Sequence, residues 1–191
     1  MSLAEANRER VLRAATSSFL AHGYSSSVDD IARRAGVAKQ TVYHHFPSKD
    51  RLFKEVVRDL AMSVLVELEG ADVRAALLRF AIAYRERALG SEGIAAFRTL
   101  VATAPRFKAL AKAMYANTAG ELVERLAQYL EGAMRDGRLR RDDPVLAAEM
   151  LMSMLAGVDR VKRLFGIERA GESNERRTAR IVDCFLRAYK S

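Results

Sequence analysis

Residues 28–53 have the sequence VDDIARRAGVAKQTVYHHFPSKDRLF. Gly36, near the middle of this stretch, is a typical residue at the end of a helix. The spacing of the apolar residues predicts one helix over about 28–35 and a second over about 39–46, where Pro47 ends it. Two short helices joined by a tight turn that contains glycine form the outline of a helix-turn-helix.

The second of these helices has an exposed face composed of residues that are suited to binding DNA. Val42 and Phe46 are four positions apart and are expected to face the interior. The opposite face has an amide, a phenol, an imidazole and an ammonium group, from Gln40, Tyr43, His44 and Lys39. Glutamine can bond two major-groove atoms of adenine, lysine can donate to guanine, and tyrosine, threonine and histidine can contact phosphates. Such a face is expected to lie against base pairs.

The composition is that of a folded protein with a basic surface. The chain has 191 residues, of which 50% are hydrophobic and 29% are charged, so disorder is not expected. The net charge of +8 permits a polyanionic partner, but residues 1–60 hold ten Lys and Arg against seven Asp and Glu. The charged N-terminus, the single Cys184 and the lack of a long apolar run predict a cytoplasmic protein with no membrane contact.

Helical periodicity continues along most of the chain, and no stretch is typical of a strand. We therefore expect an all-α fold of about nine helices. The first domain, a three-helix DNA-binding domain, is expected over about residues 1–50, and a second helical domain over about 51–191. A long helix over about 49–69 would join them. Thr118 and Glu121 have the spacing of a capping box and predict the start of a helix.

The stretch 28–53 resembles the N-terminal DNA-binding domain of the TetR family of transcriptional regulators. In that family the helix-turn-helix ends in a Tyr-x-His-Phe segment, here Tyr43 to Phe46, which a Ser-Lys pair follows, here Ser48 and Lys49. The similarity covers about residues 8–55. It implies a small core around the turn at Gly36, formed by Ile31, Ala32, Ala35, Val37, Val42 and Phe46.

The resemblance also implies that eight residues contact DNA. The implied base contacts are Lys39, Gln40 and His44, and the residues mainly on phosphates are Ser27, Thr41, Tyr43, His45 and Lys49. Ser27 would do so as the cap of the first helix of the motif. Lys49 would do so at the start of the next helix, whose N-terminus also favours an anion.

The remainder of the chain resembles AcrR-like members of the family only in length, helical content and a pair of C-terminal helices. The resemblance implies that this part binds a small-molecule effector and pairs two subunits. A homodimer is also expected on physical grounds. A single recognition helix makes only a small contact with DNA, whereas a two-fold dimer can bind a palindromic operator with two such helices. The predicted effector pocket comprises Phe80, Tyr84, Phe97, Leu100, Tyr115 and Met154. The predicted dimer interface comprises Leu151, Leu155, Val158, Ile181, Cys184 and Phe185. We expect an apolar or amphipathic effector, because no cluster of buried charge is evident.

Other functions have less support in the sequence. No nucleophile-base-acid set, phosphate loop or metal spacing is present, so neither catalysis nor a cofactor is expected. His44 and His45 point about 100° apart on a helix and have no third ligand at a helical spacing. One alternative is a helical small-molecule-binding protein or enzyme whose basic face binds anions without a sequence preference. A repressor is the expected regulator, with an activator or a regulator that responds to a protein partner as further alternatives.

Overall fold

The structure is a computed structural model, which describes the chain except residues 1, 63–67, 69, 106–107, 168–172 and 191. The described residues form helices and no strand, which confirms the predicted all-α fold. Within this described part, no helix is both long and apolar enough to cross a bilayer. The chain divides into two compact units. Unit 1 comprises Met1–Leu60 and Ala95–Asn117, and unit 2 comprises Ala61–Ile94 and Thr118–Ser191.

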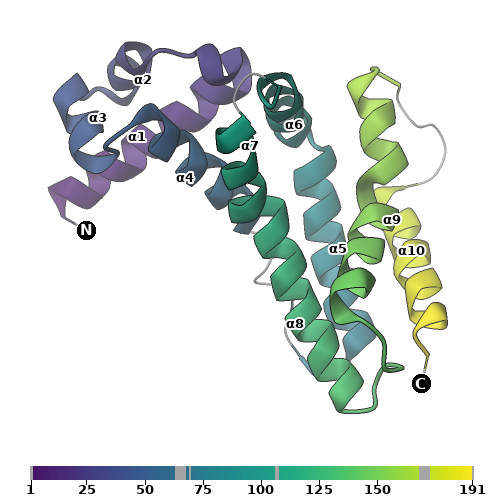
Figure 1. Ribbon diagram of the computed structural model, residues 1–191. Coiled ribbons are helices and arrows are strands. Elements are labelled where there is room, and N and C mark those ends of the chain that lie inside the picture. Colours follow the sequence, from purple (N-terminus) through teal and green to yellow (C-terminus); the bar gives the residue numbers. More distant parts are fainter. Residues whose placement is uncertain (1, 63–67, 69, 106–107, 168–172, 191) are drawn as a thin grey trace. The chain divides into compact units, whose positions relative to one another are not determined.

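Unit 1 begins with the helix-turn-helix and the two helices that pack on it (Figure 1). Its helices are α1 (Leu3–His22), α2 (Val28–Ala35), α3 (Lys39–His45), α4 (Lys49–Met62), the part of α6 (Ser91–Thr103) from Ala95 onward, and α7 (Lys108–Tyr115). The bounds of α2 and α3 agree with the predicted helices to within one residue. The predicted continuation of α4 to about residue 69 lies largely outside the described residues.

The core of unit 1 is apolar. Its buried residues come from α1, α2, α3 and α4 and from Phe46, which follows α3. From the helices they include Val11, Phe19, Ile31, Val42, Leu52, Phe53 and Val56. The rings of Phe19 and Phe53 meet edge-on, with centroids 4.7 Å apart. Because α4 supplies three of these buried residues, the compact unit extends past the boundary expected near residue 50.

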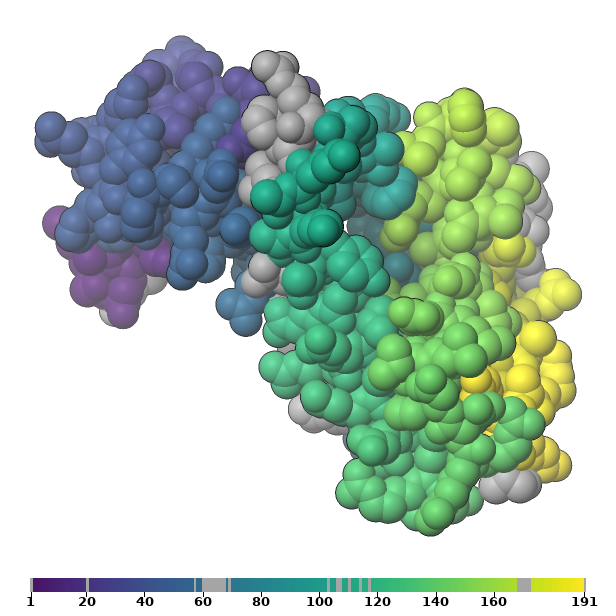
Figure 2. Space-filling view, in the orientation of Figure 1, coloured from purple at the N-terminus to yellow at the C-terminus, as the bar shows by residue number. Residues whose placement is uncertain are grey.

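Unit 2 is a bundle of long helices that lie side by side (Figure 1). They are α5 (Val73–Leu89), α8 (Glu121–Arg135), α9 (Pro144–Leu164) and α10 (Asn174–Ala188). The core between them includes Leu77, Phe80, Leu126, Leu130, Leu151, Leu155 and Phe185. In the space-filling view, α9 forms a broad surface of this unit in light green, and α10 appears in yellow at its edge (Figure 2).

A group of buried charges lies beside this apolar core. Asp159 of α9 accepts hydrogen bonds at the same carboxylate oxygen from Arg85 of α5, at 3.0 Å, and from Arg177 of α10, at 2.8 Å. Arg85 also donates to the Asn174 side chain at 2.9 Å and to the Leu155 carbonyl. Burial raises the pKa of Asp159, but the hydrogen bonds from the two arginines outweigh it and lower the pKa overall. The expectation that the chain has no cluster of buried charge is therefore wrong.

The start of α8 also differs from the prediction. A π-helical segment, Ala116–Gly120, connects α7 to α8, and Gly120 precedes α8 in a helical conformation without a side-chain cap. Thr118 is buried and does not begin a new helix. The capping-box spacing of Thr118 and Glu121 was therefore misleading, because the chain continues from one helix into the next through a wider turn.

Candidate nucleic-acid interface

The turn between α2 and α3 depends on Gly36. This residue has φ 64° and ψ 40°, the left-handed conformation that glycine adopts without strain. Its N–H donates to the carbonyls of Ala32 and Arg33, and the N–H of Val37 donates to Ala32 at 3.1 Å. A Cβ at this position would lie 2.5 Å from the Arg10 guanidinium. Gly36 therefore fixes the sharp turn that positions α3 against α2, as the sequence predicted.

The helix α3 is anchored by one side chain of its own and by the residue that follows it. Val42 is 1% exposed and Phe46 is 2% exposed, which confirms that both face the interior. Ile31, Ala32 and Ala35 are buried with them, and the partly buried Val37 packs on the same core. The remaining α3 side chains lie outside this core: Lys39, Gln40, Tyr43 and His44 are exposed, and Thr41 and His45 are half-buried. The structure thus leaves a polar face of α3 available to a partner.

Ser27 caps the start of α2. Its hydroxyl oxygen accepts a hydrogen bond from the Asp30 backbone N–H at 3.0 Å and donates to the Asp30 carboxylate at 3.1 Å. The predicted cap is confirmed, but the carboxylate bonds the hydroxyl group and not the Ser27 backbone N–H. Hydrogen bonds from Arg33 and Ser27 lower the pKa of Asp30. Ser27 itself is exposed at the N-terminus of α2, where an anion is favoured.

Lys39 is the first residue of α3, and its ammonium forms an ion pair with Asp29 of α2. The Nζ atom lies 2.9 Å from each oxygen of the Asp29 carboxylate. The hydrogen bond and the charge of Asp29 raise the pKa of Lys39. Both side chains are open to solvent, with exposed fractions of 49% and 68%. The sequence did not indicate Asp29 as a partner of Lys39, because no local pattern marks a contact ten residues away.

Lys49, at the start of α4, has a different neighbour. Its Nζ lies 4.4 Å from the centroid of the Tyr24 ring, in a cation–π contact. The Tyr24 hydroxyl donates to Asp50, and the ring also lies against Phe53, with centroids 5.1 Å apart. Burial lowers the pKa of Lys49, and the charge of Asp50 opposes this shift. Tyr24 is a second residue that sequence reasoning missed, since it lies outside the helix-turn-helix stretch.

His44 and His45 lie next to each other and their rings meet edge-on, with centroids 5.2 Å apart. Among the described residues, no group of three or more His, Cys, Asp and Glu side chains is arranged to bind a metal ion. The two histidines are instead part of the surface of α3 that includes Gln40 and Tyr43. All eight residues predicted to contact DNA are thus exposed or half-buried in unit 1, and their individual DNA contacts remain predictions.

The residues predicted for the dimer interface fall into two groups. Leu151, Leu155 and Phe185 are at most 1% exposed inside unit 2, so their side chains are not available to a second subunit, and this part of the prediction is wrong. Val158 and Cys184 are exposed, and Ile181 is half-buried. An exposed apolar stripe runs along α9 to the residue that follows it, Phe165. It is formed by residues three or four positions apart, namely Leu146, Met150, Met154, Val158, Val161 and Phe165. We call these six residues the α9 stripe.

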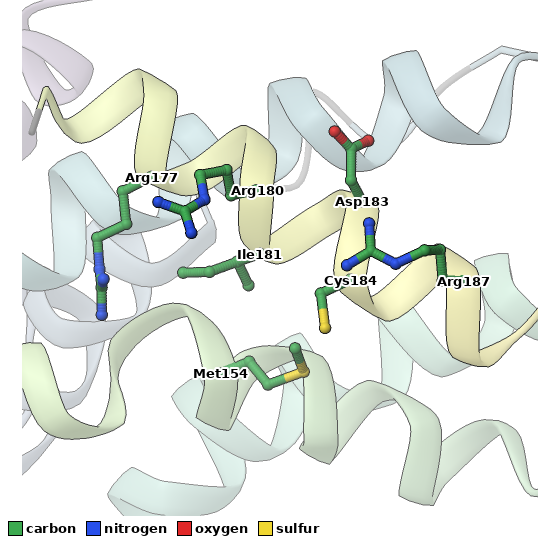
Figure 3. Close-up of a pocket in the computed structure, with 7 residues that line it drawn as sticks. All are labelled: Met154, Arg177, Arg180, Ile181, Asp183, Cys184 and Arg187. Carbon is green, nitrogen blue, oxygen red and sulfur yellow. The ribbon is translucent and has the colours of Figure 1, made fainter.

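A groove of about 480 Å³ lies beside this stripe, between α9 and α10. Figure 3 shows Met154 extending from α9 toward Ile181 and Cys184 of α10, while the Asp183 carboxylate points to the other side of that helix. The lining is completed by Arg177, Arg180, Arg187 and Asp183. The groove therefore combines a short apolar floor with edges that are mostly basic.

The predicted effector residues are divided between the two units. Phe80 and Tyr84 are buried in unit 2, where their rings stack with centroids 5.9 Å apart. Met154 lies on the α9 surface, in the groove just described. Phe97, Leu100 and Tyr115 belong to unit 1, where Leu100 packs on the core and Tyr115 is exposed. A common pocket for these residues remains a prediction.

Both parts of the chain match known families. Residues 11–56 match the bacterial regulatory proteins of the tetR family, and residues 75–191 match the C-terminal domain of AefR-like transcriptional repressors. An uncharacterized HTH-type transcriptional regulator from Mycobacterium bovis is 31% identical over 150 residues, which are 75% of this chain and 75% of that protein.

Solved structures agree with these matches over nearly the whole chain. A TetR-family transcriptional regulator from Mesorhizobium loti superposes with a TM-score of 0.83 at 27% identity, over 100% of both chains. The flavonoid-responsive regulator FrrA superposes with a TM-score of 0.74 at 31% identity, over 96% of this chain and 97% of that one. The chain therefore belongs to the TetR family of bacterial transcriptional regulators and is a helix-turn-helix DNA-binding protein, not an enzyme.

Proposed function

We propose that the protein is a homodimeric repressor that binds a palindromic operator and dissociates from it when a small apolar or amphipathic effector binds. The observation that supports this most directly is the surface of α3. Val42 is buried, whereas Lys39, Gln40, Tyr43 and His44 are exposed on one short helix that Gly36 orients. Their donors and acceptors match base edges and phosphate oxygens. The C-terminal match to AefR-like repressors supports repression as the mode of regulation.

The α9 stripe supports the proposed dimer. Val158 is 67% exposed and Phe165 is 77% exposed, and the stripe continues along the length of the helix. Such a contiguous apolar surface is uncommon on a monomer and is typical of a protein interface. Because a two-fold interface brings the same surface of both subunits together, the stripe would pack against its own copy. Two copies of α3 would then bind two half-sites of a palindrome.

The class of effector is inferred from the aromatic residues and from one relative. Phe80 and Tyr84 stack in the core of unit 2, and FrrA, which is 31% identical to this chain, is a flavonoid-responsive regulator. We propose an apolar or amphipathic ligand, bound within unit 2 near the stacked rings of Phe80 and Tyr84. Binding would favour a state of the dimer with lower operator affinity, so operator DNA must weaken effector binding by the same factor.

The decisive experiment for DNA binding is selection of bound duplexes from a random pool, followed by fluorescence anisotropy on the enriched sequence. We expect a palindrome to be enriched. Tyr43→Ala and Lys49→Ala should weaken binding to all duplexes, whereas Gln40→Ala should also relax the preference at one base pair of each half-site. Salt-sensitive binding with no enriched sequence would contradict the proposal and favour a protein that binds polyanions through its charge alone.

The dimer is tested by analytical ultracentrifugation of Val158→Glu. Two glutamates brought together at a two-fold apolar interface should produce monomers at micromolar concentration. Val101→Glu is a matched control, because Val101 is also exposed, at 54%, and belongs to unit 1. The same sedimentation for wild type and Val158→Glu would exclude the α9 stripe as the interface. The single cysteine, Cys184, offers a second test, since its labelling by a maleimide should be faster in the Val158→Glu monomer.

A further inference from the structure

We propose that Tyr24 keeps Lys49 available to DNA by separating its ammonium from the neighbouring carboxylate of Asp50. The ring of Tyr24 holds the cation and its hydroxyl holds the anion, so the two opposite charges do not pair with each other. Tyr24 is thus a positioning residue, which acts through Lys49 and need not contact DNA itself. This role rests on the proposed function, in which Lys49 binds a phosphate.

The ring of Tyr24 has a fixed place beside the start of α4. Tyr24 is the middle residue of a short 3-10 helix, Gly23–Ser25, which follows α1. Its half-buried ring lies against Phe53 of α4, with centroids 5.1 Å apart, and Phe53 in turn meets Phe19 of α1. Lys49 and Phe53 are four positions apart and therefore share one face of α4. The packing that holds the ring thus also brings it to Lys49.

Two contacts of Tyr24 divide the charges of Lys49 and Asp50. The Lys49 Nζ lies 4.4 Å from the ring centroid, and an aromatic face attracts a cation while leaving N–H groups free to donate. The Tyr24 hydroxyl donates to the Asp50 carboxylate. Burial, this hydrogen bond and the charge of Asp50 raise the pKa of Tyr24, so the hydroxyl remains a donor at neutral pH. Within the described part of the chain, Lys49 forms no salt bridge.

Without the hydroxyl, Asp50 becomes a competitor for Lys49. The Asp50 side chain is exposed and adjacent in the chain, so its carboxylate can approach the ammonium once it has lost its own donor. A paired ammonium must leave the carboxylate before it binds a phosphate, which weakens binding to every duplex. Phosphates carry no sequence information, so the operator and other sequences are affected alike. Tyr24 therefore raises the affinity for DNA and leaves the preference between sequences unchanged.

The first test is Tyr24→Phe, which keeps the ring and removes only the hydroxyl. Binding of the full-length protein to the selected operator and to a shuffled duplex is measured by anisotropy at low salt, where exposed charges are least screened. Tyr24→Phe should weaken binding to both duplexes by roughly two- to fivefold for each bound subunit. Tyr129→Phe is the matched control and should bind as wild type does, because its hydroxyl donates to the Gly70 carbonyl at 3.3 Å within unit 2.

A second substitution decides whether Asp50 is the competitor. Asp50→Asn alone should bind DNA at least as tightly as wild type, since it removes a negative charge near a phosphate. In this background Tyr24→Phe should no longer weaken binding. Asp59→Asn, which removes another exposed carboxylate further along α4, should not restore the affinity of Tyr24→Phe. A Tyr24→Phe variant that was weak only because its fold was damaged would not recover with Asp50→Asn.

Three results would overturn the inference: no loss of affinity in Tyr24→Phe, the same loss in the Asp50→Asn background, or the same loss in the Lys49→Ala background. Wild-type affinity in Lys49→Ala alone would be a different result. It would contradict the proposed phosphate contact of Lys49, and with it the role of Tyr24.

Discussion

Both units have ion pairs in solvent, but among the described residues only unit 2 also has a buried ion pair. In unit 1, Asp29 and Lys39 form an ion pair that is exposed to solvent near the N-terminal ends of α2 and α3, and the hydrophobic core of the unit does not include it. In unit 2, Asp159 is buried between Arg85 and Arg177, and the three residues connect α5, α9 and α10. An exposed pair can exchange its partner for another ligand at little cost, whereas a buried pair cannot be broken without leaving a charge unpaired inside the protein. The same chemistry is thus suited to recognition in one unit and to fixing the fold in the other.

Asp159→Asn should have the largest effect on stability. It removes the counter-charge of the buried Arg85, which is 4% exposed, and weakens the partner of Arg177. We expect the free energy of unfolding to fall by about 3–5 kcal/mol, measured by urea denaturation. Asp183→Asn is the matched control, because Asp183 pairs with Arg74 on the surface of the same unit. Equal losses for the two variants would mean that burial of the Asp159 cluster does not matter.

The Asp159 cluster should also make the protein sensitive to acid. The pKa of Asp159 in the folded protein lies below its ordinary value of 3.8. The stabilisation from this lowered pKa is therefore complete above about pH 5 and is lost as the pH falls through the folded pKa. Urea midpoints measured between about pH 5 and pH 2.5 should converge for wild type and Asp159→Asn at the acid end. A constant difference across this range would contradict the assignment.

Ser27 allows stability and DNA binding to be separated within unit 1. Ser27→Ala removes the cap of α2 and should lower the free energy of unfolding by about 1 kcal/mol. Ser27→Asp should retain the cap, because aspartate is an equally good N-cap residue and suits the helix dipole. Its charge should nevertheless weaken operator binding in anisotropy measurements, since it would face the expected phosphate. Unchanged binding by Ser27→Asp would remove Ser27 from the proposed DNA contacts.

Asp29→Asn should have the smallest effect on folding. The pair with Lys39 is exposed, so the urea midpoint should not change measurably. A clear loss of stability would indicate that the pair fixes α2 against α3, as the buried cluster fixes the helices of unit 2. The exposed pair of unit 1 and the buried pair of unit 2 would then both stabilise the fold, which contradicts the contrast drawn between them.

Features that depend on neighbouring residues in the chain were predictable from the sequence. Gly36 and Pro47 marked the helix ends, and the spacing of Val42 and Phe46 identified the buried side of α3. The exposed face of α3 was predictable too, because a short helix that buries one face must present the opposite face to solvent. The capping box at Thr118 failed because its spacing also fits a continuous helix with a π-helical turn.

The orientation of α9 was not predictable in the same way. This helix has apolar residues on more than one side, so its periodicity indicates which residues share a face and not which face is buried. Leu151 and Leu155 proved to face the core, and Met150, Val158 and Val161 proved to face solvent. The choice depends on how α5, α8 and α10 pack against α9, and the pattern of residues within α9 does not encode that packing.

The sequence alone determined the helical fold, the helix-turn-helix and the resemblance to the TetR family, because turn residues and apolar spacing act over a few positions. Only the tertiary structure decided which apolar face of α9 remains exposed and which charges are paired. Asp29 pairs with Lys39 across the turn between α2 and α3. Arg85 of α5 pairs with Asp159 of α9, which lies 74 positions further along the chain. Contacts of this kind depend on how helices pack, and no local pattern in the chain encodes them.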